Sequence, residues 1–397
     1  MRGSVPGPWL RLMAVAAAGS TLLAVVSGAA HLGAAHRLLA ALALPPLLAL
    51  VVAGLTAYRR LLAPSLAALF LFGAAALVMP RSLHIALAAL AFGAALVVAA
   101  QALQDFATGC CKVSRRDYLT LTKPRIMSLL LLTGLGGLFA GARGLPSAGT
   151  AFAAMAGLAL ACGGASALNH VLDQDIDRLM GARTSSRPVA SGRMPAAYAL
   201  EFGLALSAFS FVLLASLVNV LTAVLALVGN LFYVLVYTRW LKRSTPQNIV
   251  IGGAAGAVPP LVGWAAATGN LAWPAVFLFL IVFFWTPPHF WALALLIKRD
   301  YEAARIPMLP VVRGDRETTR QIVLYSVLLI GITALPYFWG GLGAGYLIAA
   351  LVLGALLLAL AWRLRREMTP KRARVLFHYS LAYLALLFVA VALDAAL

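Results

Sequence analysis

The sequence predicts an all-α polytopic membrane protein, in which a four-helix transmembrane bundle precedes a bundle of nine membrane helices. Hydrophobic residues make up 63% of the chain and charged residues only 11%, a composition outside the usual range of soluble domains. Apolar runs of about 20 residues, the length that crosses a bilayer as a helix, recur along the whole sequence. Short polar segments separate these runs. We therefore expect a protein that is built from helices alone and embedded in a membrane.

Thirteen apolar runs are long enough to span a membrane. Four come before Cys110, and we expect them to form one unit over residues 1–110. Nine follow, and we expect them to form a second unit over residues 111–397. The first four predicted spans are 9–30, 38–58, 62–80 and 84–104. The other nine are 126–142, 149–168, 197–217, 219–238, 248–267, 272–296, 321–340, 344–362 and 375–394.

The basic residues predict how these spans are oriented. With thirteen spans and a cytoplasmic N-terminus, 28 of the 31 lysines and arginines fall on the cytoplasmic side. Only Arg37, Arg81 and Arg143 fall outside. The net charge of +19 is therefore explained by cytoplasmic loops beside anionic lipid, and we expect no nucleic-acid partner. The C-terminus is expected on the external side of the cell (inner) membrane.

The most polar stretch of the nine-span block covers residues 169–188 and has the sequence NHVLDQDIDRLMGARTSSRP. It contains an amide and two carboxylates at spacings of four, and then two arginines four apart: Asn169, Asp173, Asp177, Arg183 and Arg187. Residues four apart lie on one face of a helix. Carboxylate and amide oxygens suit Mg²⁺, and guanidiniums suit phosphate oxygens. The pattern predicts a diphosphate site, whereas the structural alternative is a solvated loop with helix-capping carboxylates.

Two further polar loops are predicted on the same face of the membrane. One covers residues 298–320, and its position after the sixth span of the block matches that of the 169–196 loop after the second span. The other covers residues 237–248 and adds Lys242 and Arg243. Charges at the edge of an apolar bundle are costly unless they are paired or functional. We therefore expect the three loops to converge at one membrane face.

The 169–188 stretch resembles the first Asp-rich motif of the UbiA superfamily of intramembrane prenyltransferases, in the form found in its haem-farnesylating members. Four more segments are similar to that family, in the same order. They are DYLTLTKPRIMSLLL (Asp117–Leu131), YTRWLKRSTPQNIVIGGAAGAVPPLVGW (Tyr237–Trp264), WTPPHFWALAL (Trp285–Leu295) and DYEAARIPMLPVV (Asp300–Val312). The resemblance covers residues 117–395.

This resemblance implies an Mg²⁺-dependent enzyme that transfers the farnesyl group of farnesyl diphosphate to a vinyl group of haem B, giving haem O. It implies Mg²⁺ ligands at Asn169, Asp173 and Asp177, with Asp300 as a further catalytic carboxylate. The groups expected to neutralise the diphosphate are Arg183, Arg187, Lys242, Arg243 and Lys298. His170 and His289 are candidate contacts to the haem substrate, against the alternative of structural histidines. We expect the broken helix at Pro287 and Pro288 to offer His289 a free carbonyl.

Two features depart from the family pattern. Arg305 stands where glycine is expected. The second loop lacks the paired DxxxD of other superfamily members and offers only Asp300 and Glu302. A second metal on that side is therefore in doubt.

The four-span block is not part of the ordinary farnesyltransferase. His36 and His84 precede or begin its second and fourth spans, which run parallel in an up-and-down bundle. Two such imidazoles can ligate a haem b axially. The surrounding residues resemble, more loosely, one half of haem A synthase, so a link to that enzyme is expected as a partner or a fused module. The alternative is a regulatory bundle with interfacial histidines.

Two other functions remain open. One is a related prenyltransferase that acts on a quinone precursor or chlorophyllide. The other is a membrane transporter, whose charged residues would lie near the middle of the bilayer on broken helices. The clustering of carboxylates and arginines at one face favours diphosphate chemistry over transport.

Overall fold

The computed structural model describes residues 8–29, 33–56, 59–77, 87–88, 91–95, 98 and 113–397, and every regular element in these ranges is a helix. The prediction of an all-α protein is therefore confirmed for the described part of the chain. Short hydrogen-bonded loops join most of the helices, as expected where little polar backbone can be left inside a bilayer.

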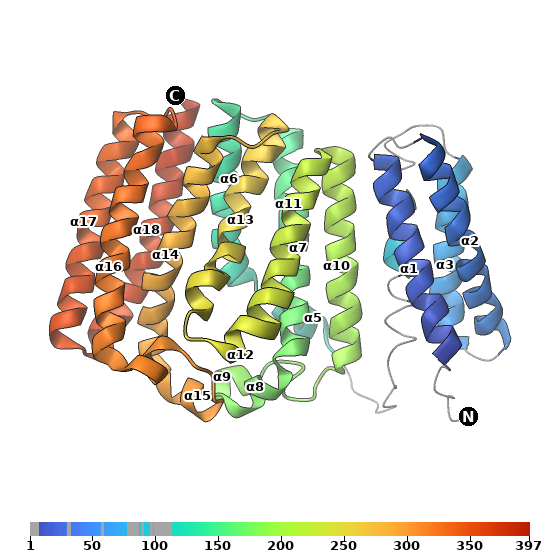
Figure 1. Ribbon diagram of the computed structural model, residues 1–397, viewed down its shortest axis with the longest axis horizontal. Coiled ribbons are helices and arrows are strands. Elements are labelled where there is room, and N and C mark those ends of the chain that lie inside the picture. The colour runs from blue at the N-terminus through green and yellow to red at the C-terminus, as the bar shows by residue number, and fades with distance from the viewer. Residues whose placement is uncertain are drawn as a thin grey trace.

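The described residues of the N-terminal block include three long helices, which Figure 1 shows side by side. They are α1 (Pro8–Ala29), α2 (Gly33–Thr56) and α3 (Arg59–Leu77), over the first three predicted spans. Helix α1 packs against α2, and α2 packs against α3. The predicted span 84–104 lies largely outside the described residues. The side chain of His36 and the whole of His84 also lie outside them, so the predicted haem ligation remains a prediction.

Within residues 113–397, nine helices are long and apolar enough to cross a membrane. The prediction of nine spans in this block is confirmed. They are α6 (Pro124–Ala142), α7 (Ala148–Leu172), α10 (Ala196–Leu217), the combined helix Val220–Ser244, α13 (Asn248–Thr268), α14 (Trp273–Leu296), α16 (Leu309–Trp339), α17 (Ala344–Glu367) and α18 (Pro370–Ala396). The combined helix consists of α11 (Val220–Leu231), the π-helix η1 (Phe232–Leu241) and α12 (Lys242–Ser244).

Short polar elements gather at one end of this bundle, opposite the C-terminus (Figure 1). They are α5 (Arg115–Leu121), α8 (Gln174–Leu179), α9 (Ala182–Ser185), α12 and α15 (Lys298–Ala303). The three polar loops that we expected at one face are therefore found there together. One apolar cluster, which includes Ile176, Ile249 and Tyr301, joins all three regions beneath the surface. This end of the bundle holds the candidate site.

Two helices differ from the prediction. Helix α14 is continuous through Pro287 and Pro288 rather than broken, because the backbone groups that a proline frees in a membrane helix can be satisfied by neighbouring side chains and helices. Helix α16 begins at Leu309, twelve residues before the predicted start at 321, because its charged first turns extend beyond the apolar run. Gly314 breaks that extension with φ 77° and ψ 171°, a backbone conformation that essentially only glycine adopts.

Candidate functional site

Asn169 and Asp173 stand where α7 ends and α8 begins. The two helices meet at Asp173, but the i to i+4 backbone hydrogen bonds continue across the junction, from Asp173 N to Asn169 O (2.9 Å) and from Asp177 N to Asp173 O (2.8 Å). The three side chains are 3%, 0% and 1% exposed, in the order Asn169, Asp173 and Asp177. A buried amide and two buried carboxylates therefore follow one another along a nearly continuous helix.

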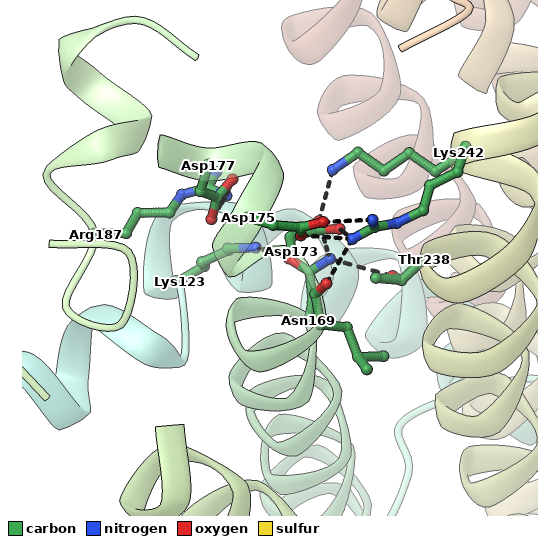
Figure 2. A network of polar contacts seen from close by, with 10 residues as sticks. Lys123, Asn169, Asp173, Asp175, Asp177, Arg187, Thr238 and Lys242 are labelled. Carbon is green, nitrogen blue, oxygen red and sulfur yellow. Dashed lines mark hydrogen bonds and ion pairs between the residues drawn. The ribbon is translucent and has the colours of Figure 1, made fainter. Parts of the chain in front are cut away.

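The side chain of Asn169 is held by partners from three different elements (Figure 2). Its Oδ1 accepts a hydrogen bond from Lys123 Nζ at 2.8 Å. Its Nδ2 donates to Asp173 Oδ2 at 2.7 Å and to Thr238 Oγ1 at 3.1 Å. These bonds fix which amide atom faces which neighbour. Asn169 is therefore an oriented group at the centre of the site.

Asp173 joins the first polar loop to the loop that follows η1. Lys242 Nζ donates to Asp173 Oδ2 at 2.6 Å, and Arg243 Nη2 lies 3.9 Å from Asp173 Oδ1. Arg243 also forms a bidentate pair with Asp175 at 2.7 and 2.8 Å, at the exposed edge of the site. Asp173 Oδ1 is buried and accepts no hydrogen bond from the described residues. One carboxylate oxygen is thus left for a ligand.

Asp177 pairs with Arg187 ten residues further along the same loop. Arg187 Nη1 donates to both carboxylate oxygens at 2.8 Å. Burial raises the pKa of Asp177, and the neighbouring guanidinium only partly opposes that shift. Asp175, in contrast, has its pKa lowered to about 2, first by the hydrogen bonds from Arg243. The buried and the exposed carboxylates of this loop therefore lie in very different environments.

Lys123 is the third cation of the buried site. Ser166 Oγ of α7 donates to Leu121 O at 2.6 Å, which fixes the chain just before Lys123. Lys123 itself has a left-handed backbone (φ 49°) at the start of α6. Burial, and second the charge of Arg187, lower the pKa of Lys123 to about 7. An anion that bound between these cations would restore the charge on the amine.

The cations of the buried site outnumber its carboxylates. Lys123, Lys242 and Arg187 approach Asn169, Asp173 and Asp177, whereas Arg243 is largely engaged by Asp175. When Lys123 is protonated, three positive groups stand against two buried carboxylates, which leaves an excess of positive charge at a largely buried site. Such a site attracts a multiply charged anion. The sequence pattern and the family resemblance together predicted these groups, with Lys123 and Arg125 as weaker candidates than the other cations, and the structure gives Lys123 a central place.

The π-helix η1 supplies Thr238 to the site and leads directly into Lys242. Tyr233 and Tyr237 of η1 stack with ring centroids 5.5 Å apart. Gly252 of α13 leaves the space that the Tyr237 ring occupies, since a methyl group there would clash with it. Segments of π-helix are rare and concentrate at functional sites. Neither this geometry nor the role of Thr238 was predicted from the sequence, because an apolar run of this composition is also compatible with an ordinary α-helix.

The second polar loop contacts the site from one side. The carboxylate of Asp300 lies against Gly181, where an added Cβ would stand 2.8 Å from Asp300 Oδ2. Lys298 does not join the cluster, because its Nζ donates to Asp315 at 2.9 Å within the same loop. Burial raises the pKa of Tyr301 to about 12. Asp300 thus packs against the turn before α9, and it forms no ion pair with the described residues.

Arg305 has the left-handed backbone (φ 52°) that explains why glycine is expected there. It follows the last residues of α15, with Ile306 N donating to Tyr301 O at 2.9 Å and Arg305 N donating to Glu302 O at 3.0 Å. This pair of hydrogen bonds is a Schellman motif, whose left-handed position favours glycine. Arg305, which departs from the family pattern, therefore strains the C-terminal end of α15.

The two candidate histidines lie in different surroundings. His170 is buried, and neither ring nitrogen has a hydrogen-bond partner among the described residues. His289 Nδ1 lies 2.7 Å from Ser380 Oγ, and its ring stacks on Trp285 and Phe377. The expected free carbonyl is therefore not its partner, because α14 is unbroken. The side chain of Arg183 lies outside the described residues.

The donor set fits a hard divalent cation. In the described part of the chain, no three His, Cys, Asp or Glu side chains gather into a metal cluster. Asn169 and Asp173 are hydrogen-bonded to each other, Asp177 follows four residues later on the same nearly continuous helix, and the buried, unpartnered Asp173 Oδ1 is the kind of atom that Mg²⁺ prefers. The remaining coordination positions of a Mg²⁺ ion are commonly filled by water and by phosphate oxygens.

Comparison with known proteins gives consistent results. A family model described as the UbiA prenyltransferase family matches residues 130–389. The protoheme IX farnesyltransferase of Symbiobacterium thermophilum is 55% identical over 281 residues, which are 70% of this chain and 94% of that protein. The enzyme of the same name from Roseiflexus sp. is 53% identical over 279 residues, 70% of this chain and 52% of that protein. The chain therefore spans about half the length of the Roseiflexus relative.

The fold is also similar to that of a solved structure. A UbiA homolog from Archaeoglobus fulgidus, bound to GPP and Mg²⁺, superposes with a TM-score of 0.54 at 18% sequence identity. The superposition covers 70% of this chain and 99% of that protein. At this identity the similarity concerns the fold alone.

Proposed function

The chain belongs to the UbiA prenyltransferase family, and from that premise we propose that it transfers the farnesyl group of farnesyl diphosphate to a vinyl group of haem B. Relatives that carry the name protoheme IX farnesyltransferase support this acceptor. The single observation that carries the proposal for this chain is the buried cluster of Asn169, Asp173 and Asp177 with its excess of cations. It combines a place for Mg²⁺ with a place for diphosphate at the edge of an apolar bundle.

The proposed reaction begins with cleavage of the allylic C–O bond of farnesyl diphosphate. The bonding electrons leave with the diphosphate, whose negative charge is neutralised by Lys123, Arg187 and Lys242. Asn169, Asp173 and Asp177 would hold Mg²⁺, which supplies further charge neutralisation to this leaving group when it is bound. The carboxylate–cation pairs of the structure would then open, so that each cation contacts a phosphate oxygen instead.

The farnesyl cation must meet the vinyl group before it meets water. Its allylic carbon forms a bond to the terminal vinyl carbon of haem B, and the positive charge moves to the carbon attached to the macrocycle. Water adds there and releases a proton, which gives the hydroxyethyl group of haem O. The apolar bundle excludes other water, and the stacked rings of Tyr233 and Tyr237 can stabilise the cation through their faces.

The remaining groups take supporting roles in this proposal. Asp300 positions the turn around Gly181 instead of holding a second metal. His170, which is buried and unpartnered, is the better candidate of the two histidines for contact with the haem substrate. The polar end of the bundle faces the cytoplasm in the cell membrane, as the distribution of basic residues predicts. The link to haem A synthase and the haem b of the N-terminal block remain predictions.

Product analysis tests this proposal directly. Purified full-length protein would be incubated with haem B, farnesyl diphosphate and Mg²⁺, and the haems would be separated by chromatography and weighed by mass spectrometry. We expect a farnesylated hydroxyethyl haem that forms only when Mg²⁺ is present. Consumption of farnesyl diphosphate with haem B left intact would point to another acceptor, such as a quinone precursor. Consumption of neither substrate would favour a transporter.

A further inference from the structure

The turn that joins α17 to α18 carries a concentration of positive charge that the proposed farnesyl transfer does not use. Residues 362–374 contain six basic side chains and one carboxylate, Glu367. The basic side chains are those of Arg363, Arg365, Arg366, Lys371, Arg372 and Arg374. Arg372 donates to both oxygens of Glu367, at 2.7 and 2.9 Å, so the carboxylate is already engaged. The turn is left with a net charge of +5, from six basic groups against one acidic group.

A second basic segment at the same end of the bundle provides a comparison. The loop of residues 298–320 also contains six basic side chains, but four carboxylates stand among them, so its net charge is only +2. The orientation of membrane helices depends on lysine and arginine and only slightly on acidic residues. Orientation therefore accounts for the basic residues of both segments but not for the scarcity of carboxylates in residues 362–374. A segment that binds an anion is expected to lack carboxylates, because they would repel its ligand.

Trp362 contacts two of these arginines. The guanidinium carbons of Arg365 and Arg366 lie 5.7 and 5.5 Å from the centre of its ring, within the range of a cation–π contact. The tryptophan is 45% exposed, and both arginines are exposed as well. Among the described residues, neither arginine is paired with a carboxylate. Two oriented guanidiniums are therefore accessible at the surface, and their planar donor groups match phosphate oxygens.

The same tryptophan belongs to a strip of exposed side chains on the outer face of α17, which we call the α17 strip. Its members follow at alternating spacings of four and three: Ile348, Val352, Ala355, Ala359, Trp362 and, as its charged end, Arg366. Helix α17 lies at the outer edge of the bundle and packs against α16 and α18 (Figure 1). From Ile348 to Arg366 the helix rises about 27 Å, close to the thickness of the hydrocarbon core. The apolar part of the strip therefore lies at the depth of acyl chains, and Trp362 and the arginines lie at the depth of headgroups.

We propose that the turn between α17 and α18, with the half of the α17 strip nearest to it, binds an anionic phospholipid. Arg365 and Arg366 hold its phosphate, and its acyl chains lie along Ala355 and Ala359. The headgroup carries a net negative charge, since a zwitterionic headgroup would bring its own cation to a turn of charge +5. A second copy of this chain is a poorer occupant of the same face, because it would place two such turns side by side. This inference goes beyond the proposed function and does not depend on it.

Lipid retention can be measured on the full-length protein by native mass spectrometry. Purified protein in detergent would receive equal amounts of phosphatidylglycerol and phosphatidylcholine with identical acyl chains, and the amount of each lipid retained would be compared. We expect the unaltered protein to retain phosphatidylglycerol in preference. A basic side chain near an anionic surface contributes roughly a fivefold factor, so Arg365→Gln combined with Arg366→Gln should lower this preference by about 25-fold. Arg365→Lys combined with Arg366→Lys keeps both charges and should keep most of the preference.

The matched control is Arg316→Gln combined with Arg320→Gln. It removes two charges from exposed positions of α16 at the same end of the bundle, and it should leave the lipid preference unchanged. Equal losses in the two glutamine double variants would overturn the proposal, because they would reveal a general effect of net charge. Equal retention of both lipids by the unaltered protein would overturn it in favour of an acidic protein partner. Displacement of the phospholipid by inorganic phosphate alone would reduce the turn to a site for free anions and would also overturn it.

Discussion

The two polar loops at the end of the bundle occupy corresponding places in the chain but differ in how they use their charges. In the first loop, Asp173 and Asp177 are fully buried and receive partners from distant parts of the sequence and from the loop itself. In the second, Lys298 and Asp315 pair with each other, and their side chains are 31% and 50% exposed. Buried charges cost far more than exposed ones, so only the first loop needs a functional reason for its charges.

This difference indicates that the first loop is the better candidate for binding Mg²⁺ and diphosphate. The first loop combines carboxylates, an amide and cations around a free carboxylate oxygen. The second contributes packing through Tyr301 and Ile306, and one carboxylate against Gly181. In the described residues, the two loops therefore differ in the contacts of their carboxylates. Substitutions in each loop test this difference between them.

The largest effect is expected from the first loop. Asp173→Ala should lower kcat for farnesyl transfer by at least about 100-fold, because it removes the carboxylate with the free oxygen. Turnover would be followed as haem product over time. Asp175→Ala is the control, since Asp175 is an exposed neighbour whose side chain, among the described residues, pairs with Arg243. Equal losses in both variants would show that the loop as a whole, and not the buried carboxylate, is required.

Arg187→Gln should act mainly on diphosphate binding. It removes the guanidinium whose Nη1 donates to both oxygens of Asp177 and with it a cation of the site, so KM for farnesyl diphosphate should rise by roughly tenfold or more. The buried carboxylate would be left unpaired, and the single variant should also be less stable. Adding Asp177→Asn should restore thermal stability without restoring activity. An unchanged KM would remove Arg187 from the diphosphate site.

Lys123 predicts a dependence on pH. Its pKa is lowered to about 7, so the amine loses its charge in the free protein as the pH rises above that value. Diphosphate favours the charged amine, and kcat/KM should therefore fall above pH 7, by up to about tenfold per pH unit. The arginine of Lys123→Arg keeps its charge above pH 7, so this variant should not show the decrease in kcat/KM that is caused by loss of the lysine charge. The ratio of the two profiles separates Lys123 from titration of the substrate, and a constant ratio would contradict the prediction.

The smallest effect is expected in the second loop. Arg305→Gly should raise the free energy of unfolding by about 1 kcal/mol, because glycine adopts the left-handed conformation without steric cost. Activity should not change. Thermal unfolding in detergent measures the difference, with Arg305→Ala as the control that removes the side chain and keeps the strain. A gain of the same size in the alanine variant would show that side-chain contacts, and not φ, limit this helix end.

Much of this arrangement could be predicted from the sequence. Apolar runs predicted the nine helices of the described C-terminal block, since the length of such a run follows from the thickness of the bilayer. The spacing of Asn169, Asp173 and Asp177 predicted that they share one face of a helix, because four residues are close to one turn of an α-helix. Arg305 was identified as unusual by resemblance alone, and the backbone now supplies the physical reason.

Other features could not be predicted because they depend on contacts between distant segments. Lys298 was predicted to contact the diphosphate and stays a prediction, and the structure adds its pairing with Asp315 of α16, 17 residues further along the chain. Thr238 reaches Asn169 through a π-helix that no local pattern reveals. The bond from His289 to Ser380 joins residues 91 positions apart. Hydropathy and spacing describe single segments, and these contacts arise from packing.

The most direct test of the asymmetry between the two loops is a binding measurement on a matched pair of variants. An unreactive analogue of farnesyl diphosphate would be titrated by calorimetry into Asp173→Asn and Asp300→Asn, with and without Mg²⁺. Each substitution removes one carboxylate charge and keeps the shape of the side chain. We predict that Asp300→Asn retains Mg²⁺-dependent binding and that Asp173→Asn loses the dependence on Mg²⁺. Loss of that dependence in Asp300→Asn, with Asp173→Asn unaffected, would contradict the account.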